Sequence, residues 1–364
     1  MKIVFLSKII PAEGSTIQQL YLGEELVKKG HQVTILTAIN PNETDNEKKV
    51  RKQIIDAGIK IESIPFSTIP LGKESKIKLL AKYIYALPYA LRVLYRIKPN
   101  VIHCHWPVTS YIAAIYRKLT GVKFISTYHA LNIPKSLLNR NANKLIAISS
   151  DLKKDVISRG IYQEEDIIIN HNGVRLKSYN DVKESNDIVE LLFVGRVNDD
   201  KGFDVLLRAL SIINDIDFKL SVIGDCEEKN HIKYKEYITN NSLDDKIIFY
   251  GYKKPDFFYK KSDILILPSR SEGFPLVVIE AMMYGVSIIR SNVGGAYDQI
   301  NDGVDGFIFE NENAEQLAEK LNILIESEEL RNKFSLKGKE KAINSFTAEI
   351  NAKKMIDIYN SLCD

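Results

Sequence analysis

Two cations in the second half of the chain have the types and spacing of an anion-binding site. Arg196 and Lys201 stand five residues apart, directly after an apolar run that is typical of a buried strand. A guanidinium fork and a lysine point charge at the carboxyl end of a strand suit a diphosphate. The alternative is that both are ordinary solvated side chains on a surface loop.

A second apolar run, at residues 264–267, is followed by Pro-Ser-Arg-Ser-Glu-Gly-Phe-Pro at 268–275. Pro275 suits the first position of a helix. The free backbone N–H groups of Leu276 and Val277 would then form an anion site at the helix N-terminus. This segment therefore predicts a second set of groups for an anionic ligand.

Two carboxylates belong to the same region. Glu272 lies in the loop before the predicted helix, and Glu280 lies about a turn and a half into it. Carboxylates accept several hydrogen bonds and are good partners for sugar hydroxyls. Glu280 could instead cap a neighbouring loop, but its flanking residues are so apolar that an unpaired carboxylate there would be costly. We expect a specific partner for it.

Short apolar strands alternate with amphipathic helical segments along the whole chain, which is typical of parallel α/β sheets. The strands are expected at residues 2–6, 32–37, 101–105, 123–127, 144–148, 189–195, 218–223, 247–250, 264–267 and 287–289. The helices are expected at residues 16–29, 76–97, 109–119, 150–159, 203–213, 231–241, 275–284, 313–326, 328–344 and 348–362.

The alternation lapses into polar residues around 179–187, which predicts an interdomain linker. We expect an N-terminal domain over 1–180, a linker over 181–187 and a second domain over 188–345. The helix over 346–364 is expected to pack back on the first domain. Two doubly wound, Rossmann-like parallel sheets facing a central cleft would bind a ligand at the carboxyl ends of their strands.

Length and composition agree with two soluble domains. The 364 residues are 45% hydrophobic and 27% charged, which suffices for two cores. Three cysteines without C-x-x-C spacing argue for a reducing compartment and against a structural zinc site. No secretory signal or apolar run of about 18 residues is evident. We expect a cytoplasmic protein, peripheral to the inner face of the cell membrane in one interpretation.

That interpretation rests on charge. Residues 1–180 hold 27 Lys or Arg and 14 Asp or Glu, giving +13, so the rest of this +3 chain carries −10. The segment 76–98 combines six cations with Leu, Ile and Tyr around Pro88. It could lie on an anionic membrane surface as a basic amphipathic helix, or pack on the core with a basic solvent face. The long-range attraction of a basic domain favours an anionic partner.

Three motifs in order carry a family resemblance. They are Gly-Arg-x-x-x-x-Lys-Gly at 195–202, Glu-Gly-Phe-Pro with a second Glu eight residues after the first at 272–280, and Val-Gly-Gly at 293–295. Each follows a predicted strand. Together they resemble the family-4 glycosyltransferases, the large retaining family of GT-B fold, and the resemblance covers nearly the whole chain.

The resemblance implies that the domain over 1–180 is the acceptor side and that the domain over 188–345 binds the nucleotide-sugar. It also implies a role for each matching position. Arg196 and Lys201 are implied to stabilise the leaving nucleoside diphosphate, Glu272 to hold donor-sugar hydroxyls and Glu280 to bind the ribose. The backbone at 273–276 is implied to lie against the sugar and phosphate. The donor-binding set expected in this domain is therefore Gly195, Gly273, Phe274, Pro275, Leu276 and Glu280, with Arg196, Lys201 and Glu272 as catalytic residues.

The first domain supplies further candidates. Gly14 occupies the place of the family's glycine-rich loop beneath the donor phosphates, although Glu13 stands where the family has a second glycine. His129 resembles the family's active-site histidine near the donor sugar. His103, His105 and Trp106, at the end of a predicted strand, either contact the acceptor or simply pack that end.

A metal site is not expected. His103 and His105 lack a nearby third ligand in the sequence, and Asp215-Ile216-Asp217 precedes a strand, so it is interpreted as a helix–strand turn. The helix dipole, Arg196 and Lys201 can neutralise a diphosphate without a metal or other cofactor.

The expected activity is transfer of a sugar, with retention, from a nucleotide-diphosphate donor, UDP by resemblance alone. The expected acceptor is a glycan or a lipid-linked molecule of cell-envelope polysaccharide or glycolipid synthesis, and no nucleic acid partner is expected. A GT-B sugar-nucleotide epimerase or phosphorylase is the main alternative, and a non-catalytic nucleotide-sugar-binding protein stays open. A dinucleotide-dependent oxidoreductase is disfavoured because residues 7–18 contain no G-x-G-x-x-G.

Overall fold

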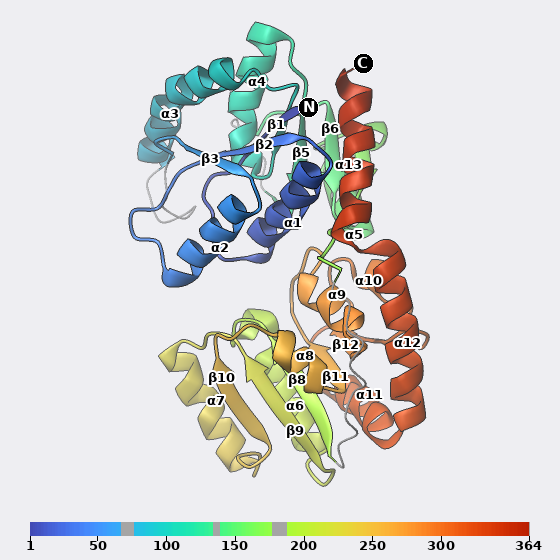
Figure 1. Cartoon of the computed structure of the whole chain (residues 1–364). Helices are drawn as coiled ribbons and strands as arrows, with labels where there is room; N and C mark the ends of the chain where they lie inside the picture. Colours follow the sequence, from blue (N-terminus) through green and yellow to red (C-terminus); the bar gives the residue numbers. More distant parts are fainter. Residues whose placement is uncertain (67–75, 134–138, 177–187, 364) are drawn as a thin grey trace. The chain divides into compact units, whose positions relative to one another are not determined.

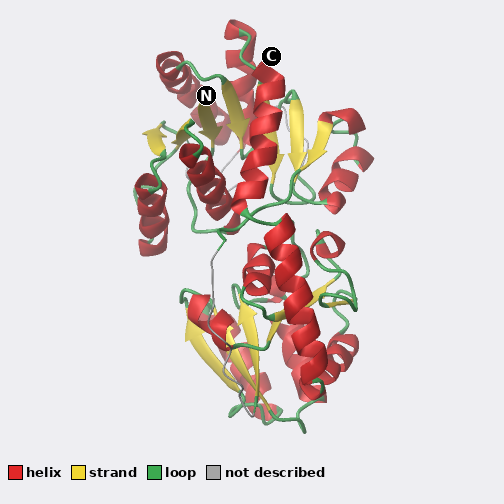
Figure 2. Ribbon diagram, turned by 45° about the vertical axis from the view of Figure 1, so that its right-hand side comes forward, coloured by secondary structure: helices red, strands yellow, loops and turns green. Residues whose placement is uncertain are grey.

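The computed structural model describes residues 1–66, 76–133, 139–176 and 188–363, which form two compact units. The first unit comprises Met1–Arg175 and Ala348–Asp364, and the second comprises Leu176–Thr347. The segment 181–187, predicted to be the interdomain linker, lies outside the described residues. In both units the strands form a sheet with helices on its two faces (Figure 1, Figure 2).

The first unit is built on a seven-stranded parallel sheet of order β3-β2-β1-β4-β5-β6-β7. Its strands are β1 (Lys2–Leu6), β2 (Gln32–Thr37), β3 (Lys60–Ser63), β4 (Val101–Cys104), β5 (Phe124–Tyr128), β6 (Lys144–Ala147) and β7 (Ile167–Ile169). The chain order reverses between β1 and β4, which are neighbours in the sheet. In open α/β sheets, ligands bind outside the carboxyl ends of the strands at this kind of reversal.

Helices cover both faces of this sheet. They are α1 (Gly14–Lys28), α2 (Asp45–Asp56), α3 (Lys76–Ile97), α4 (Ser110–Thr120), α5 (Ser150–Ser158) and α13 (Ala348–Cys363), with short 3-10 turns η1 (Pro107–Thr109) and η2 (Glu164–Asp166). Helices α1, α2 and α13 share one apolar core with the strands, and α1 lies beside α13 (Figure 1). Helix α4 packs on β4 and β5, and α3 packs on α4.

The second unit is built on a six-stranded parallel sheet of order β10-β9-β8-β11-β12-β13. Its strands are β8 (Val189–Val194), β9 (Phe218–Ile223), β10 (Ile247–Gly251), β11 (Ile264–Leu267), β12 (Ser287–Ser291) and β13 (Phe307–Phe309). Here the reversal falls between β8 and β11. The loops that follow these two strands are the ones that contain Arg196, Lys201 and Glu272.

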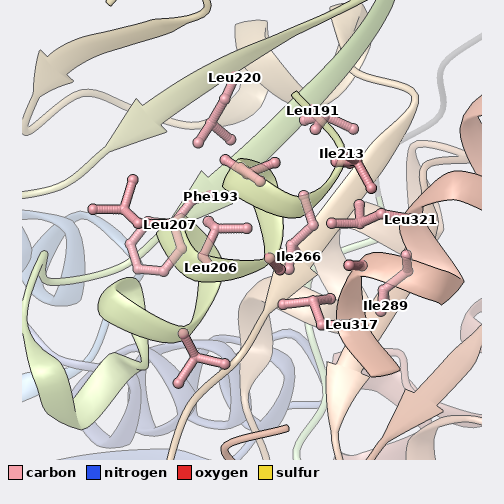
Figure 3. Close-up of a cluster of buried hydrophobic side chains, with 14 of the residues drawn as sticks. Leu191, Phe193, Leu206, Leu207, Ile213, Leu220, Ile266, Ile289, Leu317 and Leu321 are labelled. Carbon is pink, nitrogen blue, oxygen red and sulfur yellow. The ribbon is translucent and has the colours of Figure 1, made fainter. Parts of the chain in front are cut away.

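The helices of the second unit are α6 (Phe203–Ile212), α7 (Glu228–Asn240), α8 (Asp256–Lys261), α9 (Leu276–Met283), α10 (Ala296–Gln299), α11 (Ala314–Glu326) and α12 (Glu328–Ser345), with the 3-10 turn η3 (Asp199–Lys201). Figure 3 shows how α6 and α11 pack on the strands, with Leu206 and Leu321 directed at Leu191 and Ile266. Full burial of such a side chain contributes about 1.5–3 kcal/mol. This core holds the sheet rigid beneath its loops.

The predicted fold class, two doubly wound parallel α/β domains, is confirmed. One local prediction was wrong by a residue. Helix α9 begins at Leu276 and Pro275 is its N-cap, because the ψ angle of Pro275 is 124°, which is extended. The first N–H groups of the helix still belong to Leu276 and Val277, so the anion site there stays a prediction that this correction does not change.

Candidate active site

The sheet of the second unit brings two distant charged residues together. Lys201 ends η3 in the loop after β8, and Glu272 lies in the loop after β11. Lys201 Nζ is 2.6 Å from Glu272 Oε1, and the two side chains are 23% and 11% exposed. Because β8 and β11 are neighbours at the reversal of strand order, motifs 71 residues apart meet at the carboxyl edge of the sheet.

Glycines allow the loops at this edge to touch. A Cβ atom on Gly202, whose φ is +68°, would lie 1.9 Å from the Pro268 carbonyl oxygen. One on Gly294 would lie 1.8 Å from the Glu272 carbonyl oxygen. No side chain can be accommodated at such distances, so the loops after β8 and β12 can approach the Glu272 loop only through glycine.

Arg270 ties the Glu272 loop to the Lys201 loop. Its guanidinium donates to both carboxylate oxygens of Asp204, at 2.7 and 2.8 Å, and to Glu312 at 2.7 Å. Its backbone N–H donates to the Asp200 carbonyl at 3.0 Å. The neighbouring carboxylates raise the pKa of Arg270, so this bidentate clamp keeps its charge and fixes the geometry of the loop.

A buried arginine supports the same loop from β12. Arg290 is fully buried and donates to the carbonyls of Val293 and Gly294, at 2.6 and 3.1 Å, and to the amide oxygen of Gln299. Gln299 Nε2 in turn donates to the Pro275 carbonyl at 2.9 Å. The start of α9 is thus joined by hydrogen bonds to the Val-Gly-Gly loop.

Arg196 and Glu280 complete the charged set. Arg196 follows Gly195 at the end of β8; its side chain is exposed and forms no hydrogen bond or ion pair with any described residue. Glu280 is half-buried on α9 and accepts a hydrogen bond from the Tyr259 hydroxyl at 3.1 Å. The prediction that Glu280 has a specific partner is therefore confirmed, and that partner is Tyr259 on α8.

The apolar candidates of the same loop are buried. Phe274 is 3% exposed, and its ring packs edge-on against Phe346 at 5.5 Å between centroids. Leu276 is also buried at the start of α9. Gly273, which follows Glu272 in the loop before α9, is half-buried. These residues can offer a ligand their backbone groups, whereas the side chains of Phe274 and Leu276 stabilise the loop.

In the first unit two predicted residues also meet. His105 follows β4 and His129 follows β5, and His105 Nδ1 lies 3.2 Å from His129 Nε2. His103, on β4, is occupied on both ring nitrogens, by the Tyr359 hydroxyl at 2.7 Å and Thr127 Oγ1 at 2.6 Å. The interpretation that His103 packs a strand end is therefore supported.

Burial controls the charge of these histidines. It lowers the pKa of His129 to about 4 and the pKa values of His103 and His105 well below 6.5. All three rings are neutral at pH 7, so each has one donor and one acceptor nitrogen. His105 Nε2 and His129 Nδ1 are buried without a partner in the described part of the chain. They border a cavity of about 10 Å³, the size of one water molecule.

Gly14 and Trp106 lie on the two loops at the reversal of the first sheet. Gly14 is the exposed first residue of α1, and no described residue lies within 4 Å of the position of a Cβ there. Trp106 follows β4 and is half-buried. Asp215 and Asp217, by contrast, lie in the turn between α6 and β9, as predicted.

Comparison with known proteins bears on the family. Residues 13–178 match the model of Glycosyltransferase Family 4, and residues 177–341 match the model of Glycosyl transferases group 1. The chain is 30% identical over 266 residues to the lipopolysaccharide 1,6-galactosyltransferase of Escherichia coli, covering 70% of this chain and 71% of that protein. The chain belongs to the family-4, group 1 glycosyltransferases.

Another relative agrees with this family, and solved structures agree with its fold. The capsular polysaccharide biosynthesis glycosyltransferase CapM of Staphylococcus aureus is 29% identical over 249 residues, which span 64% of this glycosyltransferase and 66% of CapM. A Rickettsia africae glycosyltransferase superposes with a TM-score of 0.82 at 22% identity, covering 99% and 98% of the two chains. Anabaena HepE, solved in complex with UDP, gives 0.82 at 17% identity, covering 99% and 100%. These structures have the GT-B fold predicted for this chain.

Proposed function

We propose that this glycosyltransferase moves a sugar, with retention, from a UDP-sugar to a glycan or lipid-linked acceptor of cell-envelope polysaccharide or glycolipid synthesis. The observation that carries the proposal is the Lys201–Glu272 pair at the strand reversal, with exposed Arg196 on the same loop as Lys201. A cation for the leaving group and a carboxylate for sugar hydroxyls are the two functions that such a donor requires.

Arg196 and Lys201 are proposed to bind the diphosphate, assisted by the N–H groups at the start of α9. Glu272 then accepts hydrogen bonds from the donor sugar, and Glu280 accepts them from the ribose. Lys201 is already 2.6 Å from Glu272. A bound diphosphate would share the ammonium group with Glu272, so one lysine would align the phosphate with the residue that holds the sugar.

In the proposed reaction an acceptor hydroxyl oxygen forms a bond to the anomeric carbon on the face that the diphosphate leaves. The bond from that carbon to the phosphate oxygen breaks, and the proton of the acceptor passes to the departing phosphate. Negative charge grows on the diphosphate, so the cations at 196 and 201 act most strongly in the transition state. Metal and cofactor are not required in this scheme.

The first unit is proposed to contribute Gly14, His129, His105 and Trp106. Neutral His129 can donate or accept one hydrogen bond, and its contact with His105 holds the ring orientation. We assign His129 to the donor sugar, Gly14 to the donor phosphates, and His105 with Trp106 to the acceptor side.

The choice of nucleotide and acceptor class is supported by related proteins. Anabaena HepE is solved with UDP and with UDP-glucose. The relatives from Staphylococcus aureus and Escherichia coli are named for capsule and lipopolysaccharide synthesis. A chain with these motifs is expected to use the same kind of donor and an acceptor of similar chemistry.

The test is release of nucleoside diphosphate from a panel of UDP- and GDP-sugars, with and without isolated lipid-linked and soluble glycan acceptors. We expect release from a UDP-sugar that depends on the acceptor, and a product whose anomeric configuration, measured by NMR, equals that of the donor. Conversion of the donor without acceptor would indicate an epimerase. An inverted product would refute retention.

A further inference from the structure

The outer surface of α3 and α4 combines exposed apolar side chains with positive charge. Helix α3 buries one stripe, at Tyr83, Ala86, Ala90 and Leu94, and presents other apolar side chains to solvent. The exposed ones are Leu80 at 46%, Ile84 at 62%, Tyr85 at 59%, Tyr89 at 45% and Tyr95 at 47%, joined by Leu119 of α4 at 60%. Apolar side chains gathered in this way mark an interaction surface.

A groove runs between the two helices. Its volume is about 510 Å³, within the range of pockets that hold an organic ligand. It is lined by Tyr83, Ile84 and Leu87 of α3, Tyr111, Ala114, Ile115 and Lys118 of α4, and Arg140. Tyr111 donates from its hydroxyl to the Tyr83 carbonyl at 2.6 Å, which fixes the two helices side by side (Figure 1). The groove is apolar along its length and cationic at Lys118 and Arg140.

The sequence segment that forms the two helices is rich in basic residues and lacks acidic ones. Residues 75–150 contain twelve Lys or Arg and no Asp or Glu. Arg92, Lys98 and Lys118 are exposed on or next to the two helices. Arg96 is paired with Glu62, at 2.7 Å. A surface with so few acids attracts an anionic partner over a distance of about 10 Å at physiological salt.

We propose that the α3–α4 face binds the surface of a bilayer that contains anionic phospholipids, with Ile84 and Leu87 inserting among the acyl chains and Lys118 and Arg140 contacting headgroup phosphates. A basic helix with an apolar exposed stripe lies in the plane of such an interface. Exposed tyrosines and cations would also suit a nucleic acid, but the groove itself is lined by Ile84, Leu87 and Ile115, and such aliphatic side chains favour acyl chains over bases. None of the described helices has the length and apolar composition of a membrane-spanning segment.

This proposal adds to the proposed function, because a lipid-linked acceptor is presented at the surface of a bilayer. The test of membrane binding needs neither nucleotide nor acceptor. The full chain is sedimented with vesicles of phosphatidylcholine alone and of an equal mixture with phosphatidylglycerol, at two salt concentrations. The variants are Ile84→Glu and Lys118→Glu. Their controls are Leu336→Glu and Lys337→Glu on α12, where Leu336 is 70% exposed and Lys337 is exposed, so each control makes the same chemical change on the second unit.

We expect binding to the anionic vesicles that weakens with salt, and little binding to neutral ones. Lys118→Glu reverses a charge and should reduce binding about 25-fold, since each unit of charge near an anionic surface contributes about a factor of five. Ile84→Glu removes an inserted apolar side chain and adds an acid, so it should reduce binding at least about tenfold. The two controls should bind like the parent protein. Absence of binding to anionic vesicles, or equal losses in variants and controls, would overturn the proposal. Binding of duplex DNA with the same sensitivity to Ile84→Glu would also overturn it. Circular dichroism of each variant checks its fold, and Lys118→Glu carries the test if Ile84→Glu fails to fold.

Discussion

Lys201 Nζ and Glu272 Oε1 lie 2.6 Å apart, although 71 residues separate them in the sequence. The two side chains neutralise one another, so exposed Arg196 supplies the unpaired positive charge of the loop. A diphosphate would find one cation free and a second held beside a carboxylate. Loss of Lys201 would remove a cation and also the partner of Glu272, whereas loss of Arg196 would remove a cation alone.

Replacing Lys201 with alanine should reduce turnover by a factor of about 10²–10³, corresponding to about 3–4 kcal/mol of transition-state stabilisation, if it acts like other preorganised stabilisers of a developing anion. The measurement is kcat for diphosphate release at saturating donor. Lys229→Ala removes a lysine that is 77% exposed and should leave kcat unchanged. A Lys201→Ala enzyme with near-normal turnover would remove this residue from the mechanism.

Gly294→Ala tests the contact of the Val-Gly-Gly loop with the Glu272 loop. The added Cβ would overlap the Glu272 carbonyl, so one loop must move. We expect a loss of stability of about 1–3 kcal/mol, together with weaker donor binding. Gly303→Ala is the control, because φ is +72° there but nothing lies within 4 Å. It should lose about 1 kcal/mol of stability and keep donor affinity. Equal donor affinity in both variants would show that loop contact does not position Glu272.

Arg270→Lys tests the clamp between the two motif loops. Lysine cannot reproduce the two parallel hydrogen bonds to Asp204. We expect a loss of about 1–2 kcal/mol in the free energy of unfolding of the second unit and a several-fold rise in the KM for the donor. Lys233→Ala breaks a half-exposed pair with Asp199 in the same region and should cost less than about 1 kcal/mol. A donor KM that changes equally in both variants would argue against a special role for the clamp.

The buried histidines predict acid sensitivity of the first unit. Their folded-state pKa values lie below 6.5, about 4 for His129, so the unfolded chain binds protons that the folded chain does not. Stability therefore falls as the pH drops from about 7 toward 5, by up to about 1.4 kcal/mol per pH unit for each histidine. Trp106 is the single tryptophan of the chain, and its fluorescence reports unfolding of this unit.

The urea midpoint of that fluorescence transition should be lower at pH 5 than at pH 7. His103→Gln, which removes one titrating group, should reduce the difference between the two midpoints. A midpoint independent of pH over this range would show that these rings are not kept neutral by burial.

The sequence predicted buried strands well and edge elements poorly. The run at 264–267 is continuous and apolar, whereas the run at 218–223 places Lys219 and Ser221 between apolar residues; the structure gives both runs the predicted bounds. Edge strand β3 reads Lys-Ile-Glu-Ser and is partly exposed, and β7 and β13 have three residues each. Such segments lack a period long enough to detect. Helix α2 was missed although Thr44 and Glu47 form a capping box, a signal that the sequence does contain.

The candidate site divides in a similar way. The residues proposed to touch a ligand follow strands in short motifs, so their position along the chain is enough to propose them. Arg270, Arg290 and Tyr259 act through partners on other elements: Asp204, Gln299 and Glu280. The sequence around a tyrosine or an arginine does not identify such a partner. The partner is known only once the folded structure brings the two elements together.

The central claim is a nucleoside diphosphate-sugar site on the second unit, and calorimetry tests it most directly. UDP, GDP and NAD are titrated into the protein with EDTA present, then into Glu280→Ala and into Glu319→Ala, a change at an exposed carboxylate on α11. The account predicts binding of UDP without metal, weakened about tenfold by Glu280→Ala, as expected for a lost hydrogen bond to a charged group, and unchanged by Glu319→Ala. Tight binding of NAD, or no binding of any nucleotide, would contradict it.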